Sequence, residues 1–229
     1  MIDRCARHIP ALLAALALLA PACKTRELGD APATASTAGA KAKAPAQRVL
    51  VFSDDFNRDT LGPSWKRGKG EGGSGQWTLK DGWLNASNIK NDALWLQKPL
   101  PERVRLEFDA MALSADGDLK FEIFGDGGHH ESGYIVIFGG WKNSLDVIAR
   151  LDEHGEDRLS RPSRRVRPNQ VHKIAVERDG DTLRWFVDGQ LVIAYADKRA
   201  LRGPEHRFFA FNDWTAPVRF DNLKVYELR

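Results

Sequence analysis

Short alternating runs separated by Asp-Gly pairs constrain the fold of this chain more than any other feature. The pair occurs five times beyond residue 80, each time between apolar or alternating runs: Asp81-Gly82, Asp116-Gly117, Asp126-Gly127, Asp179-Gly180 and Asp188-Gly189. Asp-Gly between such runs is the strongest short-range signal for a β-hairpin. The pattern predicts an antiparallel, all-β protein.

The alternation is clearest over residues 103–110 and 118–123. The second run sets Leu119, Phe121 and Ile123 on one face, with Asp118, Lys120 and Glu122 on the other. Further strands are predicted at 49–53, 77–79, 83–86, 93–96, 134–138, 145–151, 172–178, 182–187, 191–195, 208–212 and 218–227, and no window shows sustained helical spacing. So many short strands in one domain predict a two-sheet sandwich or jelly roll.

Charge and cysteine are distributed unevenly along the chain. Of 34 Lys+Arg and 31 Asp+Glu, the first 47 residues hold six and three, which leaves 28 of each sign in the rest. A neutral body argues against nucleic acid as a partner, because a nucleic-acid binder carries its positive surplus on the folded part. Both cysteines, Cys5 and Cys23, precede residue 24, which excludes a disulfide framework or a Cys nucleophile in the body.

The first 22 residues have the pattern of a secretory signal peptide. Arg4 and Arg7 precede an apolar run of 12 residues, Ile9 to Ala20, and Ala20-Pro21-Ala22 fits a cleavage site. Such a run is shorter than the roughly 20 residues that span a bilayer. The chain is therefore expected to be exported.

The sequence around Cys23 predicts a lipid anchor. Residues 18–23, LLAPAC, resemble the lipobox of bacterial lipoproteins, in which the thiol receives diacylglycerol. Residues 23–47 are rich in Ala, Thr, Pro, Gly and Lys and predict a disordered tether before a domain at 48–229. Lys24, by the lipoprotein rule, implies the outer membrane or cell surface; the alternative is a periplasmic or secreted protein without an anchor.

Three stretches of the body resemble the concanavalin A-like lectin/glucanase superfamily. They are Asp54-Asp55-Phe56-Asn57, the hairpin VERDGDTLRWFVDG at 176–189, and VRFDNLKV at 218–225. The hairpin is similar to one in laminin-G-like, pentraxin-like and 3-keto-disaccharide hydrolase-like members. The resemblance covers about residues 49–227 and implies a jelly roll of two antiparallel sheets. It leaves the function open, because the fold hosts lectins, hydrolases, lyases and adhesion modules.

Glu107 and Asp109 are the first candidate for paired-carboxylate catalysis, since residues two apart on a strand share a face. The laminarinase-like branch of the superfamily uses E-x-D-x-E or E-x-D-x-x-E. Here Met111 and Ala112 occupy the positions of the third carboxylate. We therefore interpret these residues as a solvated strand face, with Arg103 and Arg105 as counter-charges.

A polar, glycine-flanked loop supplies the second candidate. If the protein is an enzyme, the predicted catalytic residues are Glu122, Asp126, His129, His130 and Glu131. A histidine there would act as general acid or base, oriented by a carboxylate. Consecutive residues on extended backbone face opposite ways, so no metal is assigned to the two histidines. The alternative is a polar hairpin tip.

Two tryptophans stand beside polar groups at predicted strand ends. Trp141, Asn212, Asp213, Trp214 and His130 are the predicted saccharide contacts, because an indole stacks on a pyranose face while amides and carboxylates bind hydroxyls. The other tryptophans are predicted core residues: Trp65, Trp77, Trp83, Trp95 and Trp185.

Two further charged groups complete the candidates. Five arginines lie between residues 158 and 167 after four acidic residues, which predicts a solvated hairpin with ion pairs; the alternative is a grip on sulfated or uronic glycans or lipid phosphates. The superfamily resemblance also implies a structural calcium between the first and last strands, for which Asp55 and Asp221 are candidates. No other cofactor is predicted.

The leading hypothesis is an envelope-anchored lipoprotein whose jelly roll binds a polysaccharide or oligosaccharide without catalysis. One alternative is a glycoside-cleaving hydrolase or lyase of the 3-keto-disaccharide hydrolase-like type. The other is an adhesion or scaffold domain without a saccharide site. Convergence of Trp141, Trp214, His130 and Asp213 on one surface would favour a saccharide site.

Overall fold

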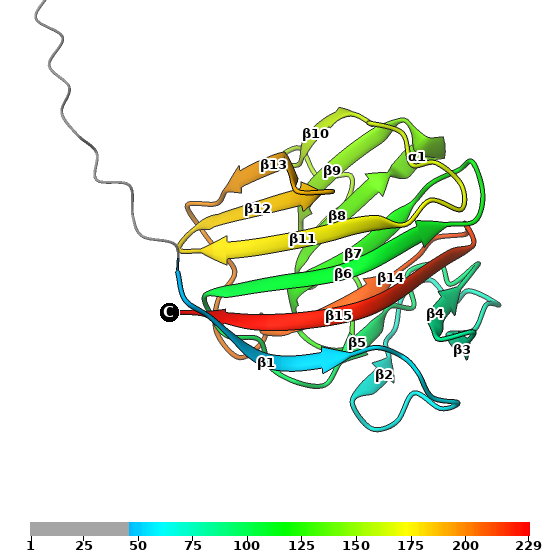
Figure 1. Cartoon of the computed structure of the whole chain (residues 1–229). Helices are drawn as coiled ribbons and strands as arrows, with labels where there is room; N and C mark the ends of the chain where they lie inside the picture. The colour runs from blue at the N-terminus through cyan, green and yellow to red at the C-terminus, as the bar shows by residue number, and fades with distance from the viewer. Residues whose placement is uncertain (1–45) are drawn as a thin grey trace, which may run out of the picture. The chain divides into compact units, whose positions relative to one another are not determined.

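The computed structural model describes residues 46–229, which form a sandwich of two antiparallel sheets (Figure 1). The predicted signal peptide, Cys23 and almost all of the predicted tether lie outside the described residues. The all-β jelly-roll prediction is confirmed. Within the described part of the chain, no helix is long and apolar enough to cross a membrane.

One sheet has eight strands, in the order β13-β12-β11-β6-β15-β4-β3, with β1 also paired to β15. Its strands are β1 (Arg48–Asp54), β3 (Thr78–Lys80), β4 (Trp83–Ala86), β6 (Val104–Ala112), β11 (His172–Asp179), β12 (Thr182–Val187), β13 (Gln190–Ala196) and β15 (Val218–Leu228). Beside β15, the backbones of Gln47 and Arg229 exchange hydrogen bonds of 3.1 and 3.0 Å. The described chain therefore starts next to its C-terminus.

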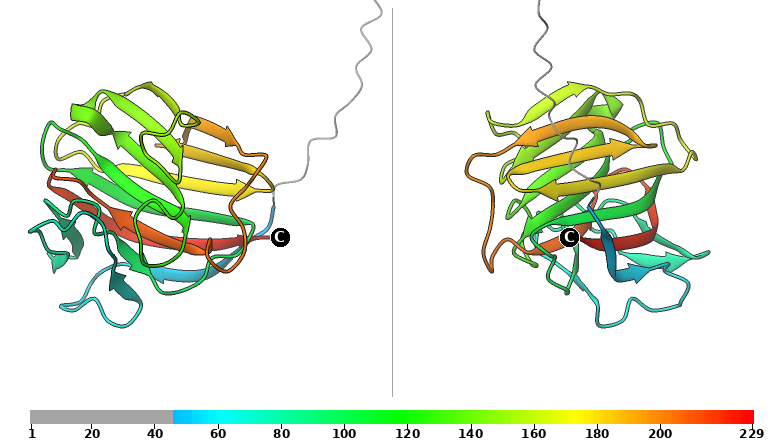
Figure 2. Two further views of the ribbon diagram at one scale, coloured as in Figure 1. Left: turned by 180° about the vertical axis from the view of Figure 1, so that it is seen from behind. Right: turned by 60° about the vertical axis from the view of Figure 1, so that its left-hand side comes forward.

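The other sheet has seven strands, in the order β10-β9-β8-β7-β14-β5-β2, and comes to the front when the molecule is seen from behind (Figure 2). Its strands are β2 (Trp65–Arg67), β5 (Leu94–Leu96), β7 (Leu119–Gly125), β8 (Tyr134–Gly139), β9 (Leu145–Arg150), β10 (Leu159–Pro162) and β14 (Phe208–Asn212). A short turn, α1 (Gly140–Asn143), connects β8 to β9.

The Asp-Gly pairs play three different roles. Asp81-Gly82 and Asp188-Gly189 are two-residue hairpin turns with positive φ at both residues, as such turns require. Next to Asp179, the hairpin loop is shifted by one residue to Gly180-Asp181. The remaining pairs form no tight hairpin: one precedes β7 on the crossing from one sheet to the other, and one opens the long loop from β7 to β8.

The core between the sheets is built around phenylalanines. Phe108 of β6 meets Phe121 of β7 and Phe211 of β14 at ring distances of 5.1 and 5.2 Å, and Phe211 stacks on Phe220 of β15 at 4.5 Å. Trp65, Trp77 and Trp185 are buried in this same core. Trp83 is only half-buried. Trp95 is buried in a separate cluster with Ala93 and Ala210, away from the core between the sheets.

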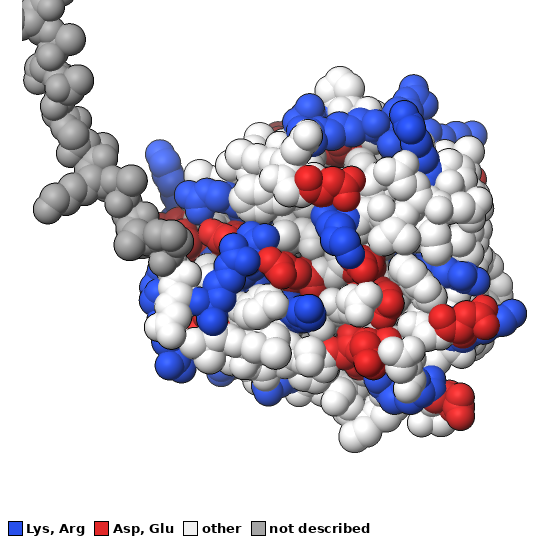
Figure 3. Space-filling model, viewed as in Figure 1, with Lys and Arg blue, Asp and Glu red and all other residues white. Residues whose placement is uncertain are grey.

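The outer face of the eight-stranded sheet carries Glu107 and Asp109. Glu107 accepts hydrogen bonds from Arg105 Nε at 2.6 Å and Arg48 Nη1 at 3.2 Å, and Asp109 accepts one from Lys173 Nζ at 2.8 Å. Acidic and basic side chains lie next to each other across this face (Figure 3). The predicted ion pairing is confirmed for Glu107 and Arg105, but Arg103 pairs with Asp179 instead, and Asp109 is buried rather than solvated.

Two strands were not predicted from the sequence: β2 and β10, which have three and four residues. The expected ion pairing beside β10 is wrong. Among the described residues, no ion pair involves any of the five arginines, Arg158, Arg161, Arg164, Arg165 and Arg167. Glu153, one of the expected partners, instead pairs with Lys120 at 2.8 Å.

Candidate functional site

Strand β7 carries a row of charged side chains on the outer face of the seven-stranded sheet. Lys120 and Glu122 alternate with core residues on β7, so they share one face, and Asp118 immediately precedes the strand with a positive φ of 60°. On the neighbouring strands β8 and β9 this face is apolar, with Ile135, Ile137, Val147 and Ala149 in one buried cluster. Lys120 and Glu122 are 2% and 0% exposed. Charged groups at this depth require partners.

Glu122 is held by two donors from other parts of the chain. Its Oε1 accepts from Asn212 Nδ2 at 2.7 Å and contacts His130 Nδ1 at 2.8 Å. Its Oε2 is buried and has no hydrogen-bond partner within the described residues. With Nδ1 donating to Glu122, the other ring nitrogen of His130 is left as a hydrogen-bond acceptor or base.

Two loops close over this part of the sheet. In the loop that follows β2, the Lys69 amide donates to the Gly128 carbonyl at 2.7 Å, and the His130 amide donates to the Lys69 carbonyl at 3.1 Å. Gly68 lies so close to Trp95 that a Cβ there would come within 2.5 Å of the indole nitrogen and of the Gly128 oxygen. The glycine-rich loop thus buries Trp95 and fixes the backbone of His130.

Lys120 is the second buried centre. Its Nζ donates to Asn91 Oδ1 at 3.0 Å and to Glu153 Oε2 at 2.8 Å. Burial disfavours the cation, but the negative charges of Asp118, Glu153 and Glu122 outweigh it and raise the pKa of Lys120. Lys120 is therefore a fixed positive charge at neutral pH. Glu153 also lies 4.0 Å from His130 Nε2, which joins the two centres.

A pair of acids with elevated pKa values completes the cluster. Burial, followed by repulsion from Asp118, raises the pKa of Asp213 from 3.8 to about 7. Burial also raises the pKa of Asp118, against the opposing effect of the Lys120 cation. Asp118 Oδ2 accepts from the Trp214 amide at 3.2 Å, while Asp213 Oδ1 is buried without a partner in the described chain. The pair retains a proton close to neutral pH.

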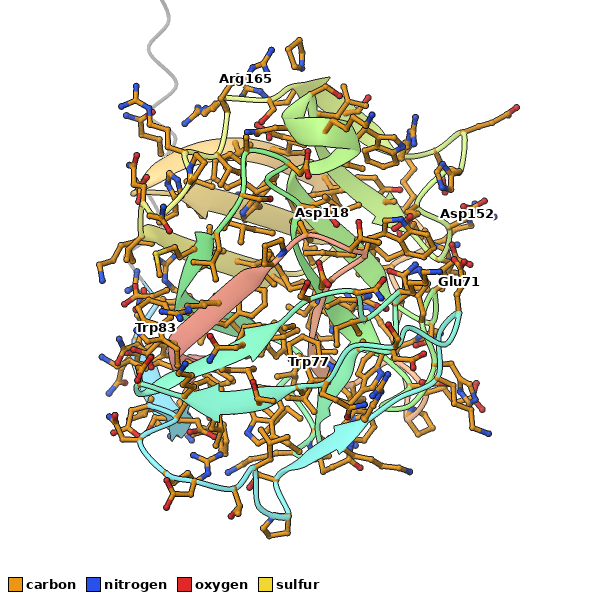
Figure 4. The ribbon with its side chains drawn as sticks, turned by 90° about the vertical axis from the view of Figure 1, so that its right-hand side faces the viewer. Glu71, Trp77, Trp83, Asp118, Asp152 and Arg165 are labelled. Atoms are coloured by element: carbon orange, nitrogen blue, oxygen red, sulfur yellow. The ribbon has the colours of Figure 1, made fainter. Side chains whose placement is uncertain are left out.

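A cavity of about 610 Å³ opens beside these groups. Asp118, Lys120 and Glu153 line it together with Trp141 and Trp214. Its full lining is Glu71, Asp116, Asp118, Lys120, Ile137, Trp141, Lys142, Glu153, His154, Trp214, Thr215 and Ala216. Figure 4 looks at this end of the molecule, with Asp118 near the middle and the loops of Glu71 and Asp152 beside it.

Turn α1 holds Trp141 at the cavity in an unusual backbone conformation. Trp141, Lys142 and Asn143 all have positive φ, at 49°, 56° and 61°. Left-handed backbone costs a residue with a Cβ roughly 1–2 kcal/mol. Asn143 fixes the turn, because its side chain accepts from the Val166 amide at 2.9 Å and donates to the Val166 carbonyl at 2.7 Å.

The structure brings most of the predicted site residues together. Glu122, His130 and Asn212 are in contact, Trp141 and Trp214 line the adjacent cavity, and Asp213 is buried beside Asp118. Three other predicted residues lie at the exposed tip of the β7–β8 loop. There His129 pairs with Asp126 at 2.7 Å, and Glu131 has one oxygen 3.9 Å from His130 Nε2.

Four residues of the site were not among those predicted from the sequence: Asp118, Lys120, Asn91 and Glu153. The signal for the first two was present: their strand alternates charged and apolar residues next to Tyr134–Phe138, a run with two apolar faces. Charges opposite such a neighbour are buried rather than solvated. Asn91 and Glu153 come from distant loops and carry no such local signal.

In residues 46–229, no group of three or more His, Cys, Asp or Glu side chains is placed to hold a metal ion. Asp55 Oδ1 accepts from the Asn57 amide at 3.1 Å, and Asp221 Oδ1 accepts from the Asn222 amide at 2.6 Å. The calcium site at Asp55 and Asp221 stays a prediction.

Several solved structures share this fold at low sequence identity. A structure from work on endo-acting O-glycanases that initiate mucin breakdown in the human gut microbiota is 16% identical, with a TM-score of 0.59 over 79% of this chain and 100% of that one. The laminarinase catalytic domain of Thermotoga petrophila is 16% identical, with a TM-score of 0.54 over 80% and 99%. The carbohydrate-binding module CBM66 of Bacillus subtilis is 16% identical, with a TM-score of 0.50 over 71% and 94%.

No curated protein matches the chain significantly by sequence. A family comparison does match: residues 52–226 fit the 3-keto-alpha-glucoside-1,2-lyase-like domain. The match covers both sheets and every residue of the cluster around Glu122 and Lys120. The chain therefore belongs to the family of 3-keto-alpha-glucoside-1,2-lyase-like domains.

Proposed function

We propose that this domain cleaves a 3-keto-α-glucoside by elimination across the C1–C2 bond of the sugar. The observation that carries the proposal is the contact of His130 Nδ1 with buried Glu122 at 2.8 Å. This pair lies beside a cavity that is lined by the Lys120 cation and by Asp118, an acid whose pKa is raised. A platform for stacking a saccharide needs no such cluster. Its burial costs folding free energy and is typical of a reactive site.

The base in this proposal is His130 Nε2. A ketone at C3 makes the C2–H bond acidic, so a base of moderate strength can remove this proton. Glu122 selects the tautomer that leaves Nε2 free, and Asn212 holds Glu122 in place from β14. Glu122 and Asn212 are therefore positioning residues.

Lys120 stabilises the charge that develops on the substrate. When C2 loses its proton, negative charge moves onto the C3 oxygen. The Lys120 ammonium already donates to Asn91 and Glu153 and has a third N–H. A buried cation that is fixed before the reaction stabilises such an oxyanion without reorganisation.

Asp118 serves as the acid. The electron pair from the C2–H bond forms the C1=C2 double bond as the bond from C1 to the leaving oxygen breaks. That oxygen takes a proton from the Asp118–Asp213 pair through Asp118, which lines the cavity, because burial raises the pKa of both acids. The products are an unsaturated 3-keto sugar and the free alcohol, and no water is consumed.

The test compares two substrates that differ only at C3. The full chain is incubated with p-nitrophenyl 3-keto-α-glucoside and with p-nitrophenyl α-glucoside. Release of p-nitrophenolate from the keto sugar alone, together with the absorbance of a conjugated enone, is the expected result. Equal cleavage of both substrates would show ordinary hydrolysis, and cleavage of neither would reject the proposal.

A second candidate is non-catalytic saccharide binding, favoured by the placement of Trp141 and Trp214 on the same cavity. The similarity of the fold to a carbohydrate-binding module is consistent with it. Affinity electrophoresis of the full chain with polysaccharides tests this function. Retardation that Trp141→Ala abolishes, without turnover of any keto sugar, would make binding the function.

We also propose that the domain works in the cell envelope, held by a lipid on Cys23. The support is the pattern of residues 1–23, since this segment lies outside the described structure. Incorporation of labelled palmitate that is lost in Cys23→Ser is the expected result. Unchanged labelling in Cys23→Ser would place the lipid on another residue, and no labelling of either protein would leave an exported protein without a lipid anchor.

A further inference from the structure

A second cavity lies where the chain crosses from the seven-stranded to the eight-stranded sheet, between β10 and β11. It measures about 340 Å³, and its lining includes Phe138, His172, Val187, Arg164, Arg165 and Arg167. None of these residues belongs to the cluster around Glu122 and Lys120. Figure 3 shows Lys and Arg side chains along the upper edge of the molecule, where this segment runs in Figure 1.

The arginines of this cavity have no carboxylate partner among the described residues. Arg165 and Arg167 are exposed and make no side-chain hydrogen bond within the described structure. Arg164 is fixed by neutral groups, because it donates to Gln190 Oε1 at 2.9 Å and to the Leu191 carbonyl at 3.2 Å. Its charge is oriented but not neutralised.

His172 and Asp188 form the inner part of the lining. His172 is buried and contacts Asp188 Oδ2 through Nδ1 at 2.9 Å, while its Nε2 is buried without a partner in the described chain. Asp188 is the only carboxylate of the lining, and its other oxygen accepts from the Lys173 amide at 2.8 Å. Three guanidinium groups thus face one carboxylate that is already occupied.

The backbone that carries the arginines is hydrogen-bonded to the turn beside the first cavity. Val166 exchanges two hydrogen bonds with Asn143 of turn α1, the turn that holds Trp141 at the cavity of Lys120. On the other side of Val166, Arg165 has a positive φ of 70°. The two cavities therefore flank one turn.

From this arrangement we infer that the arginine cavity binds the sulfate or carboxylate group of an acidic saccharide. Guanidinium groups bind both oxyanions in a bidentate manner, and three of them line this cavity. The inference rests on the proposed function in one respect: the ligand is a saccharide because the adjoining cavity is assigned to one.

The experiment measures binding of the full chain by isothermal titration. The probes are a heparin-derived oligosaccharide, an oligogalacturonate and a neutral maltooligosaccharide. The test variant is Arg165→Gln/Arg167→Gln, which removes two exposed charges. The matched control is Lys66→Gln/Lys80→Gln, which removes two exposed charges on β2 and β3, at the opposite edges of the two sheets.

We expect one of the two acidic oligosaccharides to bind more tightly than the neutral one. The arginine variant should weaken this binding about tenfold, and Arg165→Lys/Arg167→Lys should recover only part of it, because lysine is not bidentate. The lysine control should bind normally. Turnover of a neutral 3-keto-glucoside should be the same in all variants. Loss of this turnover would therefore indicate a failure of the proposed elimination, and not of oligosaccharide binding at the arginines.

Three outcomes would overturn the inference. The first is equal weakening by the lysine control, which would indicate general electrostatic attraction. The second is failure of both acidic oligosaccharides to bind. The third is arginine-dependent binding to phosphatidylglycerol vesicles but not to oligosaccharides, which would make a lipid headgroup the ligand.

Discussion

Glu122 presents two chemically different oxygens at the centre of the seven-stranded sheet. One contacts Asn212 and His130, and the other is buried with no partner in the described chain. A buried unsatisfied polar atom costs about 1–3 kcal/mol. Nothing in the packing of the sheet requires this cost, so the carboxylate is explained by what it does to His130.

Substitution of the dyad separates activity from stability. His130→Gln removes the base, and we expect kcat to fall by about 10²–10⁴-fold. Glu122→Gln keeps the shape of the side chain but not its charge, so kcat should fall while the free energy of unfolding changes by less than about 1 kcal/mol. Steady-state kinetics and denaturant unfolding measure both. Loss of stability in Glu122→Gln with normal kcat would make the residue structural.

Asp213 makes stability depend on pH. Its folded-state pKa of about 7 lies above its ordinary value of 3.8, so between these values the folded protein binds more protons than the unfolded one. The stabilisation by the protonated carboxyl is complete below pH 3.8 and is lost as pH rises to 7. Asp213→Asn removes this dependence, and at pH 8 it should gain up to about 4 kcal/mol relative to wild type.

Thermal melting at pH 5 and pH 8 is the measurement. The difference in Tm between Asp213→Asn and wild type should grow in favour of the variant from the lower to the higher pH. Asn85→Asp, on β4 away from the cluster, is the control, because it makes the reverse exchange of amide for carboxyl outside the cluster. A difference in Tm that is independent of pH would show that the Asp213 carboxyl is ionised throughout.

At the scale of elements, two strands with the same local pattern have different surroundings. Strands β6 and β7 both alternate charged and apolar residues, and the sequence correctly predicts which face of each turns to the core. The opposite face of β6 is an ionic surface, with Glu107 hydrogen-bonded to two arginines. The opposite face of β7 is covered by loops whose sequence positions are far away. Alternation cannot predict this coverage.

The sequence likewise predicted the site residues that stand at strand ends, but not those that distant loops bring in. His130, Trp141 and Trp214 stand next to predicted strand ends, where loops carry function, and all three lie at or beside the cavity. Asn91 and Glu153 reach Lys120 from loops at sequence separations of 29 and 33 residues. Trp95 was predicted as core and is fully buried, but on the outer face under the glycine-rich loop.

The glycine-rich loop gives a prediction at this scale. Gly68→Ala would bring a Cβ within 2.5 Å of both Trp95 and the Gly128 oxygen, so we expect a loss of about 1–3 kcal/mol in stability. Because this loop fixes the His130 backbone, kcat should fall as well. Gly128→Ala is the control, since its Cβ would meet only Asp126 Oδ1 at 3.8 Å. Equal effects of the two substitutions would argue against the close packing of this loop.

At the scale of the whole molecule, the strand register separates the site from the chain ends. Ala112, at the end of β6 that leads to Asp118, pairs with Val218, while Val104 pairs with Glu227 next to the C-terminus. The described chain also begins there, through the pairing of Arg48 with Leu228. Both cavities therefore lie at the end of the sandwich opposite the first and last described residues.

The fate of the C2 hydrogen tests elimination most directly. The full chain is given a 3-keto-α-glucoside deuterated at C2, with a sample lacking protein to measure spontaneous exchange, and the sugar product is analysed by mass spectrometry. Elimination predicts a product that has lost the deuterium and gained no oxygen from water, formed much more slowly by His130→Gln. A product that retains the deuterium and contains oxygen from water would contradict the account.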